Sequence, residues 1–149
     1  MKTKMLFALA AVVIAVAAVA LVVFLMQNQP HPYPTAHSYD ILNGNITVNG
    51  GSYEYYNFSL SNFANVYPTV DGTFNVSDGQ SIRVYVMDKA NFTSWQNQSA
   101  GLLYYDSGVV NNGHVTANLP MKGDYVLVYD NTFSSTPKTV NTEVMGFQV

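Results

Sequence analysis

Cysteine is absent from the 149 residues of this chain, and basic side chains are few. Without thiols the chain can form no disulfide, no zinc–thiolate or iron–sulfur site, no cysteine nucleophile and no lipid attachment at cysteine. Lys and Arg together number only six, against nine Asp and Glu. Because so few positive charges gain little from displacing phosphate counterions, we predict no nucleic-acid partner.

Recognisable catalytic and metal-binding motifs are also missing. The sequence has no G-x-S-x-G, no H-E-x-x-H and no P-loop. A serine nucleophile would need a nearby base, and His114 is the only histidine beyond residue 38. His31 and His37 could bind a metal weakly, but a stable site needs three or four well-held ligands. We therefore predict no enzymatic activity, no cofactor and no metal site.

The carboxylates are scattered along the chain, and three of the nine lie in sequences typical of turns. Asp71-Gly72 and Asp78-Gly79 are interpreted first as turn formers. Their oxygens could together contribute to a calcium site, but the spacing of an EF-hand loop is absent. The pair Asp130-Asn131 is interpreted as a turn-shaping pair that satisfies backbone amides after a strand.

Apolar residues are concentrated in one run near the start of the chain. Residues 5–26 contain no charged or polar side chain, and Lys2 and Lys4 precede them. As a helix the run would be about 33 Å long, enough to cross a hydrocarbon core of about 30 Å. Positive flanking charge marks the cytoplasmic side. We predict a cytoplasmic stub over residues 1–4, a transmembrane signal anchor over 5–26, and a single-pass cell-membrane protein whose domain is extracellular.

Two other fates of this segment stay open. A cleaved signal peptide usually has an apolar region of about 7–15 residues that ends in an A-x-A site. Here the run is longer, and A-x-A matches such as residues 15–17 and 18–20 lie inside it. Cleavage would give a secreted carbohydrate-binding accessory domain. A pilin-like filament subunit also combines a basic leader, an apolar helix and a β head, but Lys4-Met5 lacks the residues typical of its cleavage site.

A proline-rich linker and a polar domain follow the apolar run. Pro30, Pro32 and Pro34 restrict the residues before them, so residues 27–38 are predicted to form an extended spacer. Residues 39–149 carry four basic and nine acidic side chains, which gives a net charge of −5. A domain of this size can bury a sizeable apolar core without a disulfide.

Alternating apolar and polar residues predict an all-β domain, an antiparallel β-sandwich of the jelly-roll type. The expected strands cover residues 46–48, 52–60, 70–76, 82–87, 102–106, 109–111, 114–119, 125–129 and 139–149. Asn49-Gly50-Gly51 predicts a hairpin between the first two strands. Residues 125–129 are apolar at both parities, which predicts a central strand, and only residues 89–99 favour a turn of helix.

The last predicted hairpin resembles a known family. Gly123-Asp-Tyr-Val-Leu-Val-Tyr-Asp-Asn131, then Phe133-Ser-Ser and Lys138-Thr-Val-Asn141, is similar to the C-terminal half of GOLD domains. Residues 80–88 and Asn91, Phe92 and Trp95 look like the same superfamily in prokaryotic membrane-anchored proteins. The resemblance implies a sandwich that binds proteins. Cargo sorting is not implied, because a cysteine pair is missing and the anchor lies at the opposite end.

Two sets of residues are candidate sites. The N-glycosylation sequons are Asn45, Asn57, Asn75, Asn91 and Asn97. Aromatic residues expected to form a recognition surface are Tyr53, Tyr55, Tyr85, Trp95 and Tyr104, and Tyr105 is also expected to face partly outward. We predict a membrane-tethered extracellular binding or assembly module that recognises a protein or glycan partner, with self-association open.

Overall fold

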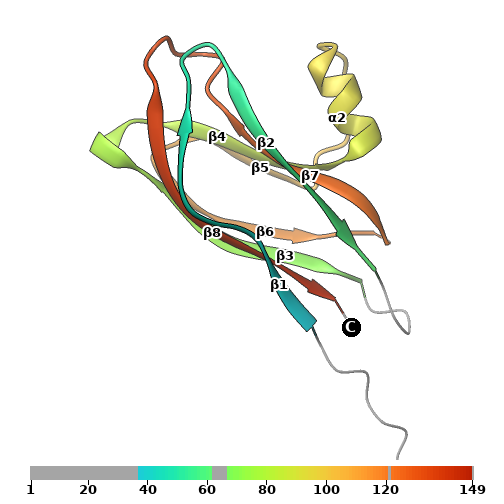
Figure 1. The fold of residues 1–149 in the computed structure, drawn as a ribbon. Coiled ribbons are helices and arrows are strands. Elements are labelled where there is room, and N and C mark those ends of the chain that lie inside the picture. Colours follow the sequence, from blue (N-terminus) through green and yellow to red (C-terminus); the bar gives the residue numbers. More distant parts are fainter. Residues whose placement is uncertain (1–36, 62–66, 121, 149) are drawn as a thin grey trace, which may run out of the picture. The chain divides into compact units, whose positions relative to one another are not determined.

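The computed structural model describes residues 37–61, 67–120 and 122–148, which form one β-sandwich (Figure 1). The predicted transmembrane segment and most of the predicted linker lie outside these residues. In the described part of the chain, no helix has the length and apolar character needed to cross a membrane. Strand β1 begins at His37, within the last two residues of the range predicted as linker.

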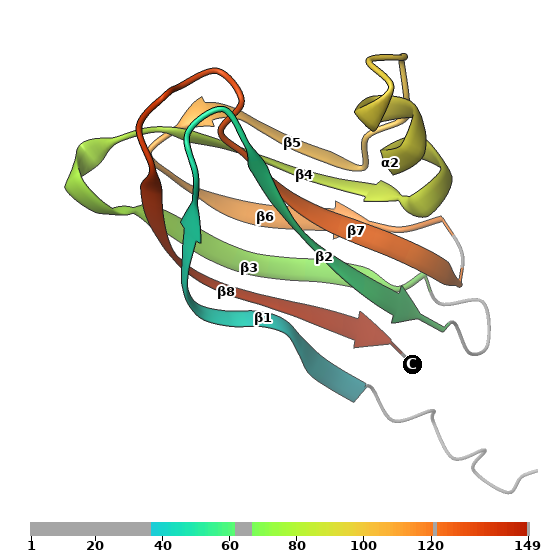
Figure 2. The ribbon, with the colours of Figure 1, turned by 45° about the horizontal axis from the view of Figure 1, so that its top comes forward.

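Two four-stranded antiparallel sheets build the sandwich, as the alternation predicts (Figures 1 and 2). The first sheet has the order β1-β8-β3-β6, with β1 His37–Val48, β8 Lys138–Gln148, β3 Thr69–Val76 and β6 Asn112–Asn118. The second has the order β2-β7-β4-β5, with β2 Tyr53–Leu60, β7 Gly123–Asp130, β4 Ile82–Asp88 and β5 Tyr105–Val110. A short 3₁₀ helix, η1 Ser77–Gly79, joins β3 to β4.

Strand β7 is central in its sheet, between β2 and β4, which confirms the prediction from its doubly apolar sequence. Tyr125, Leu127 and Tyr129 point into the core between the sheets, and Val126 and Val128 belong to a second apolar cluster on the opposite face. Because both faces of β7 are covered, the residues that point to either face are apolar.

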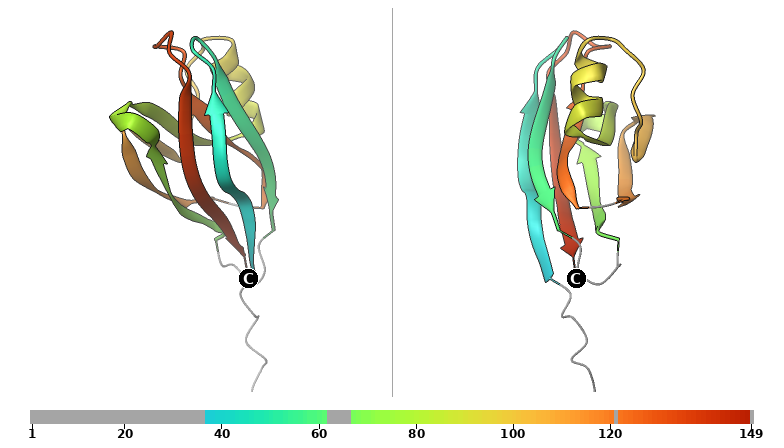
Figure 3. Two further views of the ribbon diagram at one scale, coloured as in Figure 1. Left: turned by 60° about the vertical axis from the view of Figure 1, so that its left-hand side comes forward. Right: turned by 90° about the vertical axis from the view of Figure 1, so that its right-hand side faces the viewer.

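The second cluster exists because helix α2, Lys89–Gln96, lies over the outer face of the second sheet (Figures 1 and 3). Asp88 caps the helix by accepting a hydrogen bond from the Asn91 backbone N–H at 2.7 Å. Burial alone would raise the pKa of Asp88, but hydrogen bonds from Asn91 and Tyr104 outweigh it and lower that pKa. The predicted turn of helix is confirmed.

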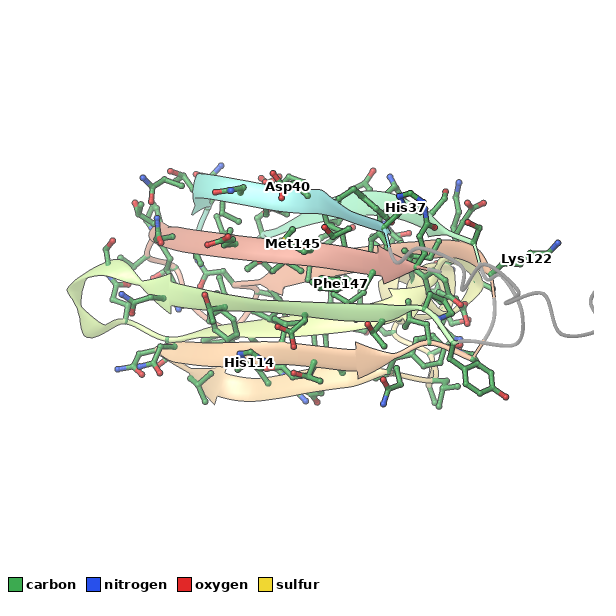
Figure 4. The ribbon with its side chains drawn as sticks, turned by 90° about the horizontal axis from the view of Figure 1, so that it is seen from below. His37, Asp40, His114, Lys122, Met145 and Phe147 are labelled. Atoms are coloured by element: carbon green, nitrogen blue, oxygen red, sulfur yellow. The ribbon has the colours of Figure 1, made fainter. Side chains whose placement is uncertain are left out.

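No helix formed by the described residues covers the outer face of the first sheet (Figure 4). One row of exposed asparagines crosses all four strands at paired positions: Asn45, Asn141, Asn75 and Asn112. The alternation of buried and exposed residues in β3, β6 and β8 follows from having the core on one face and solvent on the other.

The predicted hairpin at Asn49-Gly50-Gly51 is wrong. Strand β1 pairs with β8 and β2 pairs with β7, so the turn carries the chain from one sheet to the other. The Gly51 N–H donates to the carbonyls of Asn131 and Ser134, at 3.2 and 2.7 Å. Gly50 packs closely against the loop between β7 and β8, and Gly51 adopts the left-handed conformation of the turn with φ +70°.

Two further predictions are corrected. Asp71-Gly72 does not form a turn but lies within β3, where a Cβ on Gly72 would come 2.2 Å from the Glu143 carbonyl oxygen of β8. The strands expected at residues 102–106 and 109–111 are a single strand, β5. It continues past Gly108, which has φ +64°, because the Ser107 hydroxyl accepts the Val84 N–H at 2.8 Å where the register shifts.

Candidate functional site

Aromatic side chains from β2, β4 and α2 pack together beneath the helix. The Tyr53 ring meets the Trp95 ring edge to face, with centroids 5.0 Å apart, and Tyr55 lies 4.9 Å from Phe92. Phe92 and Trp95 stack at 5.9 Å, and Tyr85 reaches Trp95 at 5.7 Å. Aromatic pairs at these separations are each worth about 0.5–1.5 kcal/mol beyond the area they bury.

The structure brings together four of the five predicted recognition residues. Tyr53 and Trp95 are half-buried, Tyr55 is exposed, and Tyr85 is only 5% exposed, so it belongs mainly to the core beneath the helix. Tyr104 lies apart, packed against Tyr125 in the core between the sheets.

Tyr104 serves the helix cap and does not belong to the aromatic group of α2. Its hydroxyl donates to the Asp88 carboxylate at 3.1 Å. Burial first, and then this hydrogen bond, raise the pKa of Tyr104 to about 12. Tyr105 is half-buried against the core between the sheets, so it does not join a recognition surface either.

A cleft opens at the C-terminal end of α2, beside this aromatic group. Its volume is about 650 Å³. It is lined by Tyr53 from β2, by Trp95 and Gln96 from α2, by Gln98, Ser99 and Ala100 after the helix, and by Asp130 and Thr132 at the end of β7. The cleft thus combines aromatic rings, amides, hydroxyls and one carboxylate.

Local contacts fix the polar walls of the cleft. The Gln96 side-chain amide donates to the Tyr53 hydroxyl at 2.9 Å, which ties the helix to β2. Asp130 is 6% exposed, and its Oδ1 accepts the Thr132 N–H at 2.8 Å. This last contact confirms that Asp130 shapes the turn after β7 by satisfying a backbone amide.

Gln98 holds an unusual backbone conformation. Its φ is +56°, and it has the only positive φ among the described residues other than glycine. The Gln98 N–H donates to the Trp95 carbonyl at 2.9 Å and the Ser99 N–H donates to the Ser94 carbonyl at 2.9 Å. These two bonds form a Schellman motif, in which glycine is the usual residue at the left-handed position.

Tyr53 and Trp95, which line the cleft, are among the predicted recognition residues, whereas the polar residues of the lining are not. Gln96, Gln98 and Thr132 lie in segments without a motif, and Asp130 was interpreted only as a turn residue. One feature of the sequence could have indicated Gln98. A helix that begins near Lys89 has to end within residues 94–100, and this segment contains no glycine to terminate it.

Other charged groups of the described residues lie outside the cleft. Arg83 makes a two-pronged ion pair with Asp106, through Nε–Oδ1 at 2.9 Å and Nη2–Oδ2 at 2.5 Å. His114 Nε2 lies 3.0 Å from Asp71 Oδ2 on the exposed face of the first sheet. Within the described ranges, no group of three or more His, Asp or Glu side chains could hold a metal ion.

Sequon asparagines lie in three different settings. Asn45, Asn57 and Asn75 are exposed on strands. Asn97 is exposed at the C-cap of α2, where its Nδ2 donates to the Thr93 carbonyl at 2.9 Å. Asn91 lies in α2, with its Nδ2 2.6 Å from the Asp88 carboxylate and its Oδ1 accepting the Leu102 N–H at 2.8 Å.

Comparison with known proteins leaves the family of the chain open. No family model matches the sequence, and no curated protein matches it, so the GOLD resemblance stays a prediction. Solved structures with a similar fold include a mitogen of Yersinia pseudotuberculosis, with 8% identity and a TM-score of 0.44 over 75% of this chain and 86% of that one.

Two more similar structures come from other sources. One is a pilus protein of Bacillus endospore appendages, with 10% identity and a TM-score of 0.45 over 80% of this chain and 91% of that one. The other is the CBM36-1 domain of a multidomain xylanase from the hindgut metagenome of Trinervitermes trinervoides. It shares 12% identity and a TM-score of 0.41 over 76% of this chain and 96% of that domain.

Proposed function

We propose that this protein is a membrane-tethered extracellular binding module that holds a glycan in the cleft beside α2. The lining of that cleft carries the proposal, because the Tyr53 and Trp95 rings adjoin the amide of Gln98, the hydroxyl of Thr132 and the carboxylate of Asp130. A sugar ring has C–H faces that pack on aromatic rings, and hydroxyls that need both donors and acceptors. The GOLD resemblance of the last hairpin adds only a general role in binding.

The size of the cleft favours a glycan over a protein partner. Small-ligand sites have volumes of roughly 300–1,000 Å³, and this cleft has about 650 Å³. A standard protein–protein interface buries about 800 Å² on each partner and is centred on exposed aromatic anchors. Here the aromatic rings are half-buried walls of a cleft. The proposed activity is binding without catalysis.

The membrane tether of the proposal is supported by the sequence. Residues 5–26 are long and apolar enough to span a bilayer, and Lys2 and Lys4 precede them. The mature N-terminus of the protein from its native cell tests this part. An intact Met1 supports the anchor, a start near residue 5 supports a filament subunit, and a start after Ala20 supports a secreted domain.

Replacing Tyr53 with alanine is expected to weaken glycan binding by at least about tenfold, a loss of about 1.4 kcal/mol, because it removes one aromatic wall. Trp95 is the only tryptophan of the chain and lines the cleft, so its fluorescence reports occupancy directly. The full-length chain is titrated with neutral oligosaccharides in a detergent without a sugar headgroup, since alkyl glycosides would compete.

Tyr67→Ala is the matched control for this experiment. Tyr67 is 63% exposed and does not line the cleft. We expect its affinity to equal that of the unmodified chain. A Tyr53→Ala variant that binds as tightly as the Tyr67→Ala variant, or an unmodified chain that binds proteins but no oligosaccharide, would contradict a glycan site in this cleft.

Exposed sequons are expected to carry glycans if the domain is exported by a glycosylating route. Asn45, Asn57 and Asn75 present their amides to solvent, whereas the Asn91 amide is enclosed by Asp88 and Leu102. Mass spectrometry of peptides from the native protein should therefore find Asn91 unmodified and glycans at the exposed strand sites. An intact mass equal to that of the bare polypeptide would dismiss this expectation.

A further inference from the structure

We infer that Gln98 sets the ligand specificity of the cleft and that its ligand is an uncharged sugar. This inference rests on the proposed function and names the ligand class of that same site. Three observations carry it: the backbone conformation of Gln98, the free amide of its side chain, and the charge of the cleft lining.

Gln98 occupies a position where glycine would be least strained. With a φ of +56°, the backbone of Gln98 lies in the left-handed region, which residues other than glycine rarely adopt because their Cβ is crowded there. The Schellman bonds of Gln98 and Ser99 need only the backbone, so glycine at 98 would make them equally well. The glutamine side chain is therefore not explained by the end of the helix, and strain of this kind is concentrated at functional sites.

The side chain of Gln98 lines the cleft and has its hydrogen-bonding groups available. It is exposed, and within the described ranges its side-chain amide makes no hydrogen bond. The neighbouring Gln96 differs, because its amide already donates to the Tyr53 hydroxyl. A carboxamide offers two donors and one acceptor group, which can bind a pair of vicinal sugar hydroxyls.

The charge of the cleft selects against acidic ligands. Asp130 contributes a carboxylate to the lining, and no Lys, Arg or His is among the described residues that form it. Arg83 and Lys138 interact electrostatically with Asp130 but do not line the cleft. A uronic acid, sialic acid or sulfated sugar would therefore bring a second negative charge against Asp130 without a cation in the lining to bind it. Hydroxyls of an uncharged sugar can instead donate to this carboxylate in a charge-assisted hydrogen bond.

The test compares Gln98→Gly with the unmodified full-length chain. The Tm is expected to rise by about 4 °C, because glycine relieves the left-handed strain. Affinity for neutral oligosaccharides is expected to fall by at least about tenfold, because a hydrogen-bonding pair is lost. Gln98→Asn, which keeps an amide and tolerates the left-handed region, should recover part of the affinity.

Gly79→Gln is the matched control. Gly79 has φ +66°, a Cβ added there would meet no atom within 4 Å, and the residue does not line the cleft. We expect the Tm of this variant to fall by as much as the Tm of Gln98→Gly rises, and its affinity for neutral oligosaccharides to stay unchanged. It thereby separates the cost of a left-handed glutamine from the effect of the side chain on binding.

The outcomes distinguish this inference from the proposed function. If the unmodified chain binds a glycan and Gln98→Gly binds it equally well, Gln98 is not the specificity residue, although the glycan site stands. Tighter binding of acidic than of neutral oligosaccharides would overturn the ligand class. If neither neutral nor acidic oligosaccharides bind to the unmodified chain, the proposed function and the inference both fail.

Discussion

Replacing Asn131 with alanine is expected to lower the free energy of unfolding by about 3 kcal/mol, because buried carbonyl groups lose their donor. Asn131 is fully buried. Its Nδ2 donates to the carbonyl oxygens of Val48, Asn49 and Thr136, at 3.2, 3.1 and 2.9 Å. One side chain thus joins the turn after β1 to the loop between β7 and β8.

The charge of the substituent should matter more than its size. Asn131→Asp keeps the shape but places carboxylate oxygens against the three carbonyl oxygens, so we expect a larger loss than with alanine. Asn141→Ala is the control, since its Nδ2 bond to Asn45 Oδ1 lies on an exposed face and should contribute no more than about 0.5 kcal/mol. Denaturant unfolding followed by circular dichroism measures all three. Equal stability of the Asn131 and Asn141 alanine variants would refute this role.

Gly50→Ala is expected to destabilise the same corner by about 3 kcal/mol or more, because the added methyl group has no space. A Cβ at Gly50 would lie 2.0 Å from the Ser135 carbonyl oxygen and 2.2 Å from its carbonyl carbon. Both are backbone atoms, which a rotamer change cannot move. The loop between β7 and β8 would have to shift away from the turn.

The adjacent glycine is a matched control with a different cause. Gly51 has φ +70°, and a Cβ at this position would have nothing within 4 Å. Gly51→Ala should therefore cost only about 1–2 kcal/mol, which is the strain of the left-handed conformation. Thermal unfolding of the two variants separates close packing from backbone strain. A smaller loss at Gly50 than at Gly51 would show that the turn does not pack on Ser135.

Alternation along single strands was enough to predict most of the sandwich. In β2 the pattern places Phe58 and Leu60 in the core, and both are buried, while Val70, Phe74 and Val76 of β3 are buried around Gly72 as expected. In β7 the doubly apolar sequence indicates cover on both faces, and α2 provides the outer cover. These predictions succeeded because a strand buried on one face alternates apolar and polar residues, whereas a strand buried on both faces is apolar throughout.

Strand pairing and the cleft could not be predicted in the same way. Asn49-Gly50-Gly51 suits a hairpin locally, but Gly50 is needed for packing against Ser135, which is 85 positions away in the chain. Likewise, Asp130 and Gln98 come together only because β7 ends beside the C-terminus of α2. Such contacts between distant segments leave no periodic signal, so the polar half of the site appeared only in the structure.

Mapping the bound ligand onto the domain tests the central claim most directly. In a nuclear magnetic resonance titration of the full-length chain with a neutral oligosaccharide, the largest shift changes should fall on the Trp95 indole N–H and the Gln98 side-chain amide, with smaller ones at Thr132. Changes confined to the open face of the first sheet, around His114 and Phe147, or the absence of any change at saturating oligosaccharide, would contradict a glycan site beside α2.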